Sequence, residues 1–175
     1  MRIGIGYDSH RFNARRGPVN PHTKDFGVGV KLGGVAIPHP RGLAGHSDAD
    51  VLLHAVADAL LGAIGAPDLG ELFPPTDPRY RHADSRRFVE QAYARVRQAG
   101  WRVGNLDATV VADAPALTPH KRRMREAISR LLHIKSSDVS VKAKTTEGLP
   151  PGKQGIAAHA VVLLVKRTQD SRLKT

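Results

Sequence analysis

The chain of 175 residues contains no cysteine, which excludes disulfides, zinc–thiolate sites and thiol nucleophiles. Any transition metal must therefore be held by histidine, aspartate or glutamate. No stretch approaches the roughly 20 apolar residues that span a bilayer, and the N-terminal MRIGIGYDSH has no apolar run long enough for a signal peptide. We therefore expect a cytoplasmic protein that binds no membrane.

Aromatic residues make up only 5% of the chain, too few for the stacking platforms of single-strand nucleic-acid binders. The formal net charge of +11 suits nucleic acid, an anionic membrane, phosphorylated small molecules or simply a well-solvated surface. Because the excess is spread over 11–16, 79–87, 121–125 and the tail after Val165, one dedicated basic face is not indicated. We expect no nucleic-acid partner, and keep a basic nucleic-acid-binding module as an alternative.

Hydrophobic residues (41%) and charged residues (25%) occur at ordinary globular levels, so we expect a single domain over 1–165 and a polar tail over 166–175. Periodicity and turn residues predict strands at 1–6, 28–37, 106–111, 138–144 and 156–165, and helices at 48–64, 84–99 and 119–133. Gly- and Pro-rich connections are predicted at 11–27 and 65–77. The expected fold class is α/β: a single-domain sandwich with a mixed sheet of about four main strands and helices packed on one face.

The first candidate site residues are Asp8 and His10, just beyond the first predicted strand. In an extended chain, residues two apart point to the same side, so a carboxylate and an imidazole aim at a common point. An isolated Asp-x-His more often caps a turn. His54 reverses this preference, because it lies in an apolar helix with Asp50 and Asp58 one turn before and after it on the same face.

A lone histidine on an apolar helix is more often a core residue. Flanking carboxylates, however, are what a metal-bound imidazole needs to orient its second ring nitrogen, or what a proton-transfer histidine needs to hold its tautomer. Asp8, His10 and His54 would leave a fourth position open in a tetrahedral zinc site, which is the catalytic arrangement. We therefore predict zinc at these residues, with manganese or another divalent ion as the alternative.

Two further patterns suit phosphate. His46 and Ser47 precede the helix, where free N–H groups and the helix dipole attract anions, and we expect Ser47 to cap the helix as well. The run 145–147, Thr-Thr-Glu, follows a strand; hydroxyls beside a carboxylate suit a magnesium ion shared with phosphates, although such residues commonly form only a turn. The segment 148–153 is not a P-loop, because its glycine spacing is wrong and Gln154 stands where Ser or Thr is required.

Five segments follow one another along the chain: GYDSHRF, LAGHSDADVLLHAVADALLGA, PDLGELFPPTDPRYRHADS, VVADAPALTPH and KAKTTEG. Together they resemble the 2-C-methyl-D-erythritol 2,4-cyclodiphosphate synthase family over nearly the whole chain. The resemblance implies a phosphorus–oxygen lyase of the non-mevalonate isoprenoid pathway. In its reaction, the 2-phosphate of 4-diphosphocytidyl-2-C-methyl-D-erythritol 2-phosphate attacks the β-phosphorus, the cyclic diphosphate closes and CMP leaves.

The resemblance also implies roles for particular residues. Zinc on the three ligands above would act as a Lewis acid, and a magnesium or manganese ion on Glu147 would bridge the substrate diphosphate. His46 and Thr145 would stabilise the transition state. The family forms homotrimers with active sites between subunits, so part of each site is expected from a neighbouring chain.

The resemblance implies two groups of substrate contacts. The methylerythritol part would lie against 68–70 and 73–77, and the cytidine diphosphate against 112–118 and 144–147. The implied contacts are Ser9, Ser47, Asp68, Leu69, Gly70, Phe73, Pro74, Pro75, Thr76, Asp77, Ala112, Asp113, Ala114, Pro115, Ala116, Leu117, Thr118, Lys144, Thr146 and Lys153.

Three departures from the family pattern concern the nucleotide pocket and a loop. Ala116 stands where the family usually has lysine. The loop after Glu147 is shorter than usual and carries PPGKQGIA, so that a basic phosphate contact is either lost or passed to Lys153. The loop 13–27 is longer than typical. A generic metal-dependent phosphohydrolase would share the same metal site but release inorganic phosphate instead of CMP.

Overall fold

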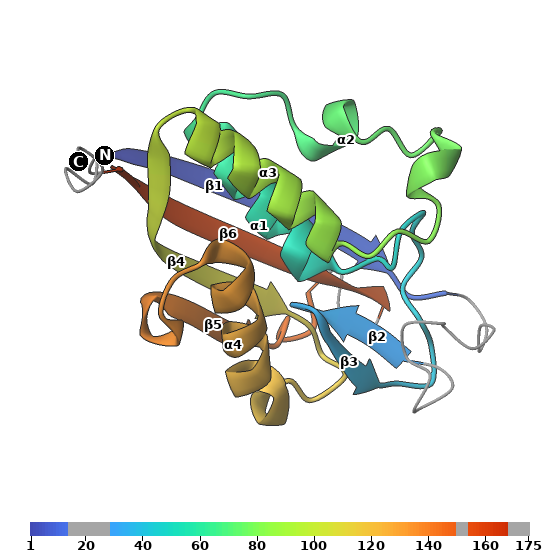
Figure 1. Cartoon of the computed structure of the whole chain (residues 1–175). Helices are drawn as coiled ribbons and strands as arrows, with labels where there is room; N and C mark the ends of the chain where they lie inside the picture. Colours follow the sequence, from blue (N-terminus) through green and yellow to red (C-terminus); the bar gives the residue numbers. More distant parts are fainter. Residues whose placement is uncertain (14–28, 150–153, 168–175) are drawn as a thin grey trace, which may run out of the picture.

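The structure is a computed structural model, and it describes residues 1–13, 29–149 and 154–167. A four-stranded mixed sheet runs in the order β1-β6-β4-β5 (Figure 1). Its strands are β1 (Arg2–Arg11), β4 (Trp101–Val111), β5 (Val139–Lys144) and β6 (Gly155–Lys166). β6 is antiparallel to both β1 and β4, whereas β4 and β5 are parallel. The predicted mixed sheet of four main strands is confirmed.

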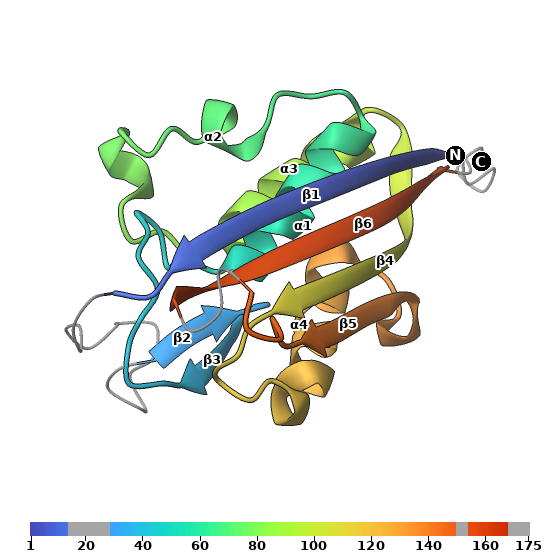
Figure 2. The ribbon, with the colours of Figure 1, turned by 180° about the vertical axis from the view of Figure 1, so that it is seen from behind.

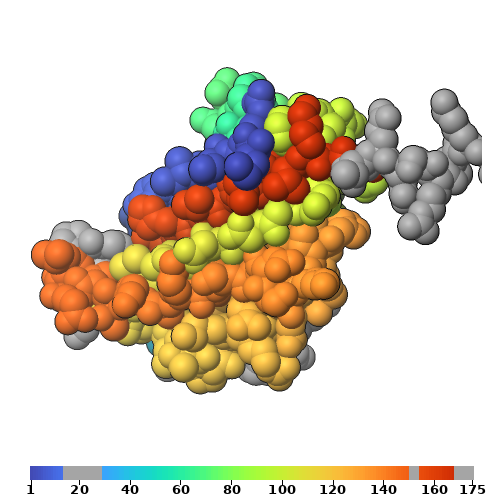
Figure 3. All heavy atoms as spheres, turned by 90° about the vertical axis from the view of Figure 1, so that its left-hand side faces the viewer, coloured from blue at the N-terminus to red at the C-terminus, as the bar shows by residue number. Residues whose placement is uncertain are grey.

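Three longer helices pack on one face of this sheet. They are α1 (Val51–Ala63), α3 (Arg86–Gln98) and α4 (Lys121–Leu132). α1 lies on β1 and β6, α3 lies on α1, and α4 covers β5. Seen from behind, the strands lie in front of the helices, and in the described part of the chain no helix covers this open face (Figure 2). Figure 3 shows the four strand segments as adjoining blue, red, yellow-green and orange bands.

Smaller elements complete the described chain. They are the antiparallel pair β2 (Gly29–Leu32) and β3 (Val35–Pro38), the short helix α2 (Leu69–Leu72), and 3₁₀ turns at Pro78–Tyr80, Thr118–His120 and Ser136–Asp138. β2 and β3 form their own two-stranded sheet, joined by the predicted Gly33-Gly34 bend. α2 falls inside the connection predicted over 65–77, where Asp68 caps it by accepting the N–H of Glu71 at 2.9 Å.

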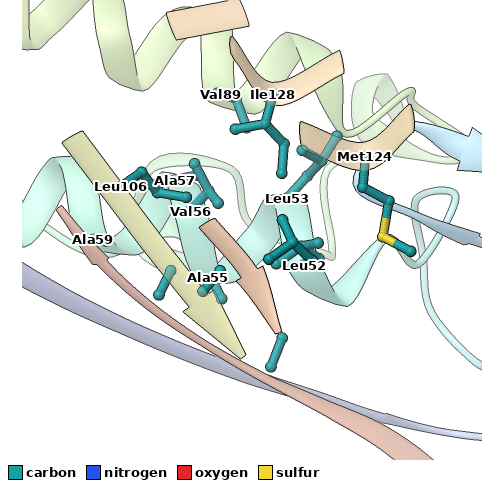
Figure 4. Close-up of a cluster of buried hydrophobic side chains, with 14 of the residues drawn as sticks. Leu52, Leu53, Ala55, Val56, Ala57, Ala59, Val89, Leu106, Met124 and Ile128 are labelled. Carbon is teal, nitrogen blue, oxygen red and sulfur yellow. The ribbon is translucent and has the colours of Figure 1, made fainter. Parts of the chain in front are cut away.

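The core is centred on α1, whose sequence VLLHAVADALLGA is buried on almost every side. Figure 4 shows Leu52 and Leu53 among Val89 of α3 and Met124 and Ile128 of α4. Full burial of each such side chain stabilises the fold by about 1.5–3 kcal/mol. A helix that is apolar all round can sit only between two layers, here the sheet and α3.

α1 approaches β1 closely because of two glycines. A Cβ at Gly4 would lie 2.0 Å from the carbonyl oxygen of Ala59, and one at Gly6 would lie 1.9 Å from that of Ala55. Alternation along β1 puts Asp8 and His10 on the same face as these glycines. Gly4 and Gly6 therefore allow β1 to pack directly against α1, the helix that carries His54.

Three predicted boundaries are wrong. β1 does not end at Gly6 but continues to Arg11, which pairs with Gly155, so Asp8 and His10 lie within the strand. The N-cap of α1 is Asp50, not Ser47: its carboxylate accepts the N–H of Leu53 at 3.0 Å.

The third error concerns β4, predicted to begin at 106 but beginning at Trp101. A shift in the strand register between Val103 and Asn105 breaks the alternating pattern there.

Candidate active site

Asp8, His10 and His54 converge on one point between β1 and α1. Asp8 Oδ2 lies 3.1 Å from His10 Nε2 and 2.9 Å from His54 Nδ1, and the two ring nitrogens are 3.3 Å apart. In a tetrahedral zinc site with bonds of about 2.1 Å, ligand atoms are about 3.4 Å apart. The donor set and its spacing therefore fit a divalent cation.

Electrostatics within this group also suit a cation. Burial alone would raise the pKa of Asp8, but hydrogen bonds and positive charge from His10 and His54 outweigh burial and hold that pKa well below its usual range. Burial alone would lower the pKa of His10, yet its hydrogen bond to the Asp8 carboxylate raises it. A carboxylate and two imidazoles this close require a proton or a metal ion between them.

The second ring nitrogen of His54 is hydrogen bonded, but not to the predicted aspartates. Its Nε2 lies 2.9 Å from Ser85 Oγ and 3.2 Å from Ser47 Oγ. Asp50 instead accepts the N–H groups of Gly33 and Gly34 at 2.8 and 2.7 Å, in addition to its role as N-cap. Helical spacing predicted that Asp50 would face His54, but its carboxylate accepts N–H groups at the start of α1 and in the turn between β2 and β3 instead.

Burial raises the pKa of both aspartates that flank His54. Burial and the charge of Asp48 raise the pKa of Asp50 to about 6, against three backbone N–H donors. Asp58 accepts the N–H of Leu69 at 2.8 Å, and burial raises its pKa. Asp58 therefore anchors the start of α2 at the wall of the site.

A cavity of about 380 Å³ opens beside the triad. It is lined by Asp8, His10, His46, Ser47, His54, Asp58, Asp68, Leu69, Gly70, Phe73, Pro75, Tyr80 and Phe88. Its polar lining includes the triad and Asp58. An aromatic wall is formed by Phe73, Tyr80 and Phe88, whose ring centroids lie 4.9–5.9 Å apart, and the Phe88 ring also lies 5.9 Å from that of His54. Sequence reasoning named Phe73 of this wall but missed Tyr80 and Phe88, because the rings come from separate segments, and it also missed Ser85 beside His54.

The segment predicted to hold methylerythritol is only partly on this cavity. Asp68, Leu69, Gly70, Phe73 and Pro75 line it, whereas Pro74, Thr76 and Asp77 do not. Asp77 caps the following 3₁₀ turn by accepting the backbone N–H of Arg79 at 2.9 Å. It also forms an ion pair with the Arg79 guanidinium group.

The predicted nucleotide residues form a second cluster. Thr146 donates its N–H and its hydroxyl to Asp113 at 2.9 Å, and the Ala112 N–H donates to Lys144 O at 2.9 Å. Thr145 donates its hydroxyl to Glu147. These hydrogen bonds join the segments 112–118 and 144–147 at the ends of β4 and β5. Lys153 lies outside the described residues.

The two clusters share one end of the sheet but not one edge. Ser9 of β1 and Val111 of β4 both pair with Ala157, which places the strand ends at one level. β5 is three strand positions from β1, which corresponds to about 14 Å. A single chain therefore does not bring Thr145 and Glu147 to the triad. The side chain of Ser9 lies on the open face, opposite Asp8 and His10, because directions alternate along a strand.

Fold and site together define an α/β protein with a candidate Asp/His/His metal centre, and the YgbB family model matches residues 1–165, so the chain belongs to this family. A relative from Azotobacter vinelandii, named 2-C-methyl-D-erythritol 2,4-cyclodiphosphate synthase, is 52% identical over 94% of this chain and 99% of its own length.

Solved structures agree with the family assignment. A CDP-bound 2C-methyl-D-erythritol-2,4-cyclodiphosphate synthase is 37% identical, with a TM-score of 0.81 over 94% of this chain and 100% of its own. The bifunctional IspDF from Campylobacter jejuni matches with a TM-score of 0.83 and 37% identity over 95% of this chain. This chain spans only 42% of that bifunctional protein. No helix in the described residues is long and apolar enough to cross a membrane.

Proposed function

We propose that this chain converts 4-diphosphocytidyl-2-C-methyl-D-erythritol 2-phosphate into 2-C-methyl-D-erythritol 2,4-cyclodiphosphate and CMP. The observation that carries the proposal is the Asp8–His10–His54 triad in the wall of a cavity that Asp68, Leu69 and Gly70 also line. Relatives named for this activity, and a relative solved with CDP, support it. The enzyme would be a cyclising, CMP-releasing phosphorus–oxygen lyase of the isoprenoid pathway, contained in residues 1–165 and active in the cytoplasm.

In this proposal Asp8, His10 and His54 hold zinc, and Glu147 holds magnesium or manganese together with the substrate diphosphate. When bound, the zinc would supply Lewis-acid polarisation of a phosphoryl oxygen. The chain itself supplies alignment. An oxygen of the 2-phosphate forms a bond to the β-phosphorus, the bond from that phosphorus to the CMP oxygen breaks, and CMP departs with the electron pair. No covalent bond to the enzyme is required, so positioning and electrostatics carry the catalysis.

His46 and Ser47 lie at the cavity, next to the triad, where they can hydrogen bond to phosphate oxygens. The carboxylate of Asp68 is held at the cavity wall by its cap bond to α2, in position to accept from a sugar-alcohol hydroxyl. The aromatic wall supplies apolar surface beside the triad, with the Phe88 ring 5.9 Å from that of His54, and would limit water near the bound phosphates. Low water content strengthens every charge interaction with the diphosphate.

We further propose a homotrimer with active sites between subunits, because one chain holds two half-sites. The triad and the cluster around Thr145 and Glu147 lie at opposite edges of the sheet. The uncovered sheet face supports this assembly: Ile3 and Ile5 are 71% and 70% exposed, beside exposed Tyr7 and Val161. Large apolar side chains gathered on one face are typical of an interface between proteins.

Two experiments test the proposed reaction. In phosphorus NMR with the diphosphocytidyl substrate, we expect a cyclic diphosphate and CMP; inorganic phosphate as the sole product would favour the phosphohydrolase instead. Metal analysis should give about one zinc per chain. Asp8→Ala and His54→Ala should lose both zinc and turnover, while Asp138→Asn, in a turn away from the cavity, should retain both. Full zinc occupancy in both alanine variants would remove the metal assignment.

The nucleic-acid alternative makes a different prediction. A basic module would bind polynucleotide with an affinity that falls steeply with salt, and Asp8→Ala would not affect that binding. The relatives named as a cyclodiphosphate synthase favour the enzyme over such a module, and the proposal includes no nucleic-acid partner and no membrane partner.

A further inference from the structure

The hydroxyl of Ser85 occupies an unusual place for a serine at the start of a helix. Ser85 is the N-cap residue of α3, yet its side chain makes no capping hydrogen bond. An N-cap serine normally accepts a backbone N–H in the first turn of the helix. Ser85 is fully buried, and its hydroxyl points to His54 instead. The serine hydroxyl that would normally cap the helix therefore contacts a residue of the candidate metal site instead.

The direction of each hydrogen bond around Ser85 follows from its partners. Asp48 Oδ2 accepts from Lys31 Nζ at 2.7 Å and from the Ser85 N–H at 3.2 Å. Asp48 forms a buried ion pair with the ammonium group of Lys31, and a carboxylate in such a pair only accepts hydrogen bonds. The single hydroxyl hydrogen of Ser85 is therefore donated to Asp48 Oδ1. Toward His54, Ser85 can only accept.

We infer that Ser85, held by Asp48 and Lys31, is a positioning residue that keeps a hydrogen on Nε2 of His54 and so leaves the Nδ1 lone pair for the metal. Nδ1 is the nitrogen that faces Asp8 and His10. Because Asp8 Oδ2 lies 2.9 Å from Nδ1, the carboxylate would by itself favour a hydrogen on that nitrogen, which blocks metal binding. The acceptor at Nε2 opposes this and selects the tautomer that can coordinate.

The same chain of contacts fixes the ring in space. Lys31 comes from β2. Its Nζ also lies 3.0 Å from Oδ1 of Asp84, the residue that precedes Ser85. The two-stranded sheet, the segment before α1 and the start of α3 are thereby tied to one imidazole. Carboxylate partners of metal-bound histidines commonly act in this way, and here the carboxylate acts through a serine.

The inference rests on the metal-binding part of the proposed function, and zinc affinity measured by chelator competition tests it. Ser85→Ala should bind zinc about 10- to 100-fold more weakly than the wild type, the range typical for loss of such a partner. Ser129→Ala is the matched control, because Ser129 is also buried but donates to Glu126 O on α4; its zinc affinity should equal that of the wild type. Ser47→Ala tests the second hydroxyl near Nε2, and an equal or larger loss there than in Ser85→Ala would overturn the inference.

Asp48→Asn gives a sharper test of hydrogen-bond direction. Lys31 and the Ser85 N–H require an oxygen at the Oδ2 position, so the amide nitrogen must face Ser85. Ser85 would then accept from the amide and donate to His54 Nε2, which moves the histidine hydrogen to Nδ1. We expect a larger loss of zinc affinity than in Ser85→Ala.

Nitrogen-15 NMR of the histidine rings separates failure of the inference from failure of the proposed function. At about pH 8.5, roughly two units above the ordinary imidazole pKa, wild-type His54 should carry a hydrogen on Nε2, and Asp48→Asn should not. A bare Nε2 in the wild type, or unchanged zinc affinity in a folded Ser85→Ala, would overturn the inference. A wild type that binds no zinc but has the expected Nε2–H would overturn the metal site while the tautomer assignment stands.

Discussion

Replacement of Gly6 by alanine tests how the fold builds the site. The new Cβ would lie 1.9 Å from the carbonyl oxygen of Ala55 and 2.7 Å from the backbone nitrogen of Ala59. Both atoms are helix backbone and cannot rotate away. Ordinary contact begins at 3.4 Å, so α1 and β1 must separate by about 1.5 Å locally.

The expected cost follows from this displacement. Overpacking of a core typically costs about 1–3 kcal/mol, and a clash with helix backbone atoms belongs at or above the upper end. The free energy of unfolding, measured in urea, should fall by about 3 kcal/mol. Zinc affinity should fall as well, because His54 directly precedes Ala55 and metal–ligand distances tolerate only about 0.2 Å.

Gly62→Ala is the matched control on the same helix. Gly62 is exposed, and its nearest neighbour is the carbonyl oxygen of Ile5 at 3.7 Å. Alanine there should leave zinc binding unchanged and stabilise the helix by up to about 1 kcal/mol. The free energy of unfolding of Gly6→Ala could instead lie within about 0.5 kcal/mol of the wild-type value, with zinc still bound. In that case the close approach of β1 and α1 would not position the site.

Three further predictions concern capping, pH and assembly. Asp50→Ala should lower the free energy of unfolding in urea by about 2 kcal/mol or more, because it removes the cap and leaves buried N–H groups unpaired. Burial alone would raise the pKa of Asp84, but hydrogen bonds from Arg86 and Lys31 hold it well below its usual range. The stabilisation by ionised Asp84 is therefore present above about pH 4 and lost as the pH falls below that value. At neutral pH, Asp84→Asn should lower the free energy of unfolding by about 1 kcal/mol after solvent screening, and this difference from the wild type should shrink in urea unfolding curves measured at acid pH. A difference independent of pH would contradict this. Asp8→Ala and Glu147→Ala should each be inactive alone, but an equimolar mixture refolded together should regain about a quarter of wild-type turnover if each site joins two chains at random, and no regain would place both half-sites in one chain.

The residues of the candidate metal centre could be picked out from the sequence because each has a local signal, whereas their convergence depends on the packing of α1 against β1. Asp8 and His10 are two apart, which puts them on one side of any extended chain, and His54 stands out as the single polar ring in an apolar helix. Likewise, turn residues and apolar spacing were enough to predict the main strands and helices. The partners of His54 could not be found in this way, since spacing along a helix indicated Asp50 and Asp58.

Tertiary structure decided everything that depends on segments distant in sequence. Ser85, Asp48 and Lys31 meet at His54 only because β2 and the start of α3 pack beside α1. The strand order decides that Glu147 lies three strands from the triad, and no periodicity encodes strand order. The direction of each side chain along one strand or helix follows from the local backbone geometry. This direction was therefore determined by the sequence alone. Which elements become neighbours is fixed by burial of their apolar faces, which only the packed chain defines.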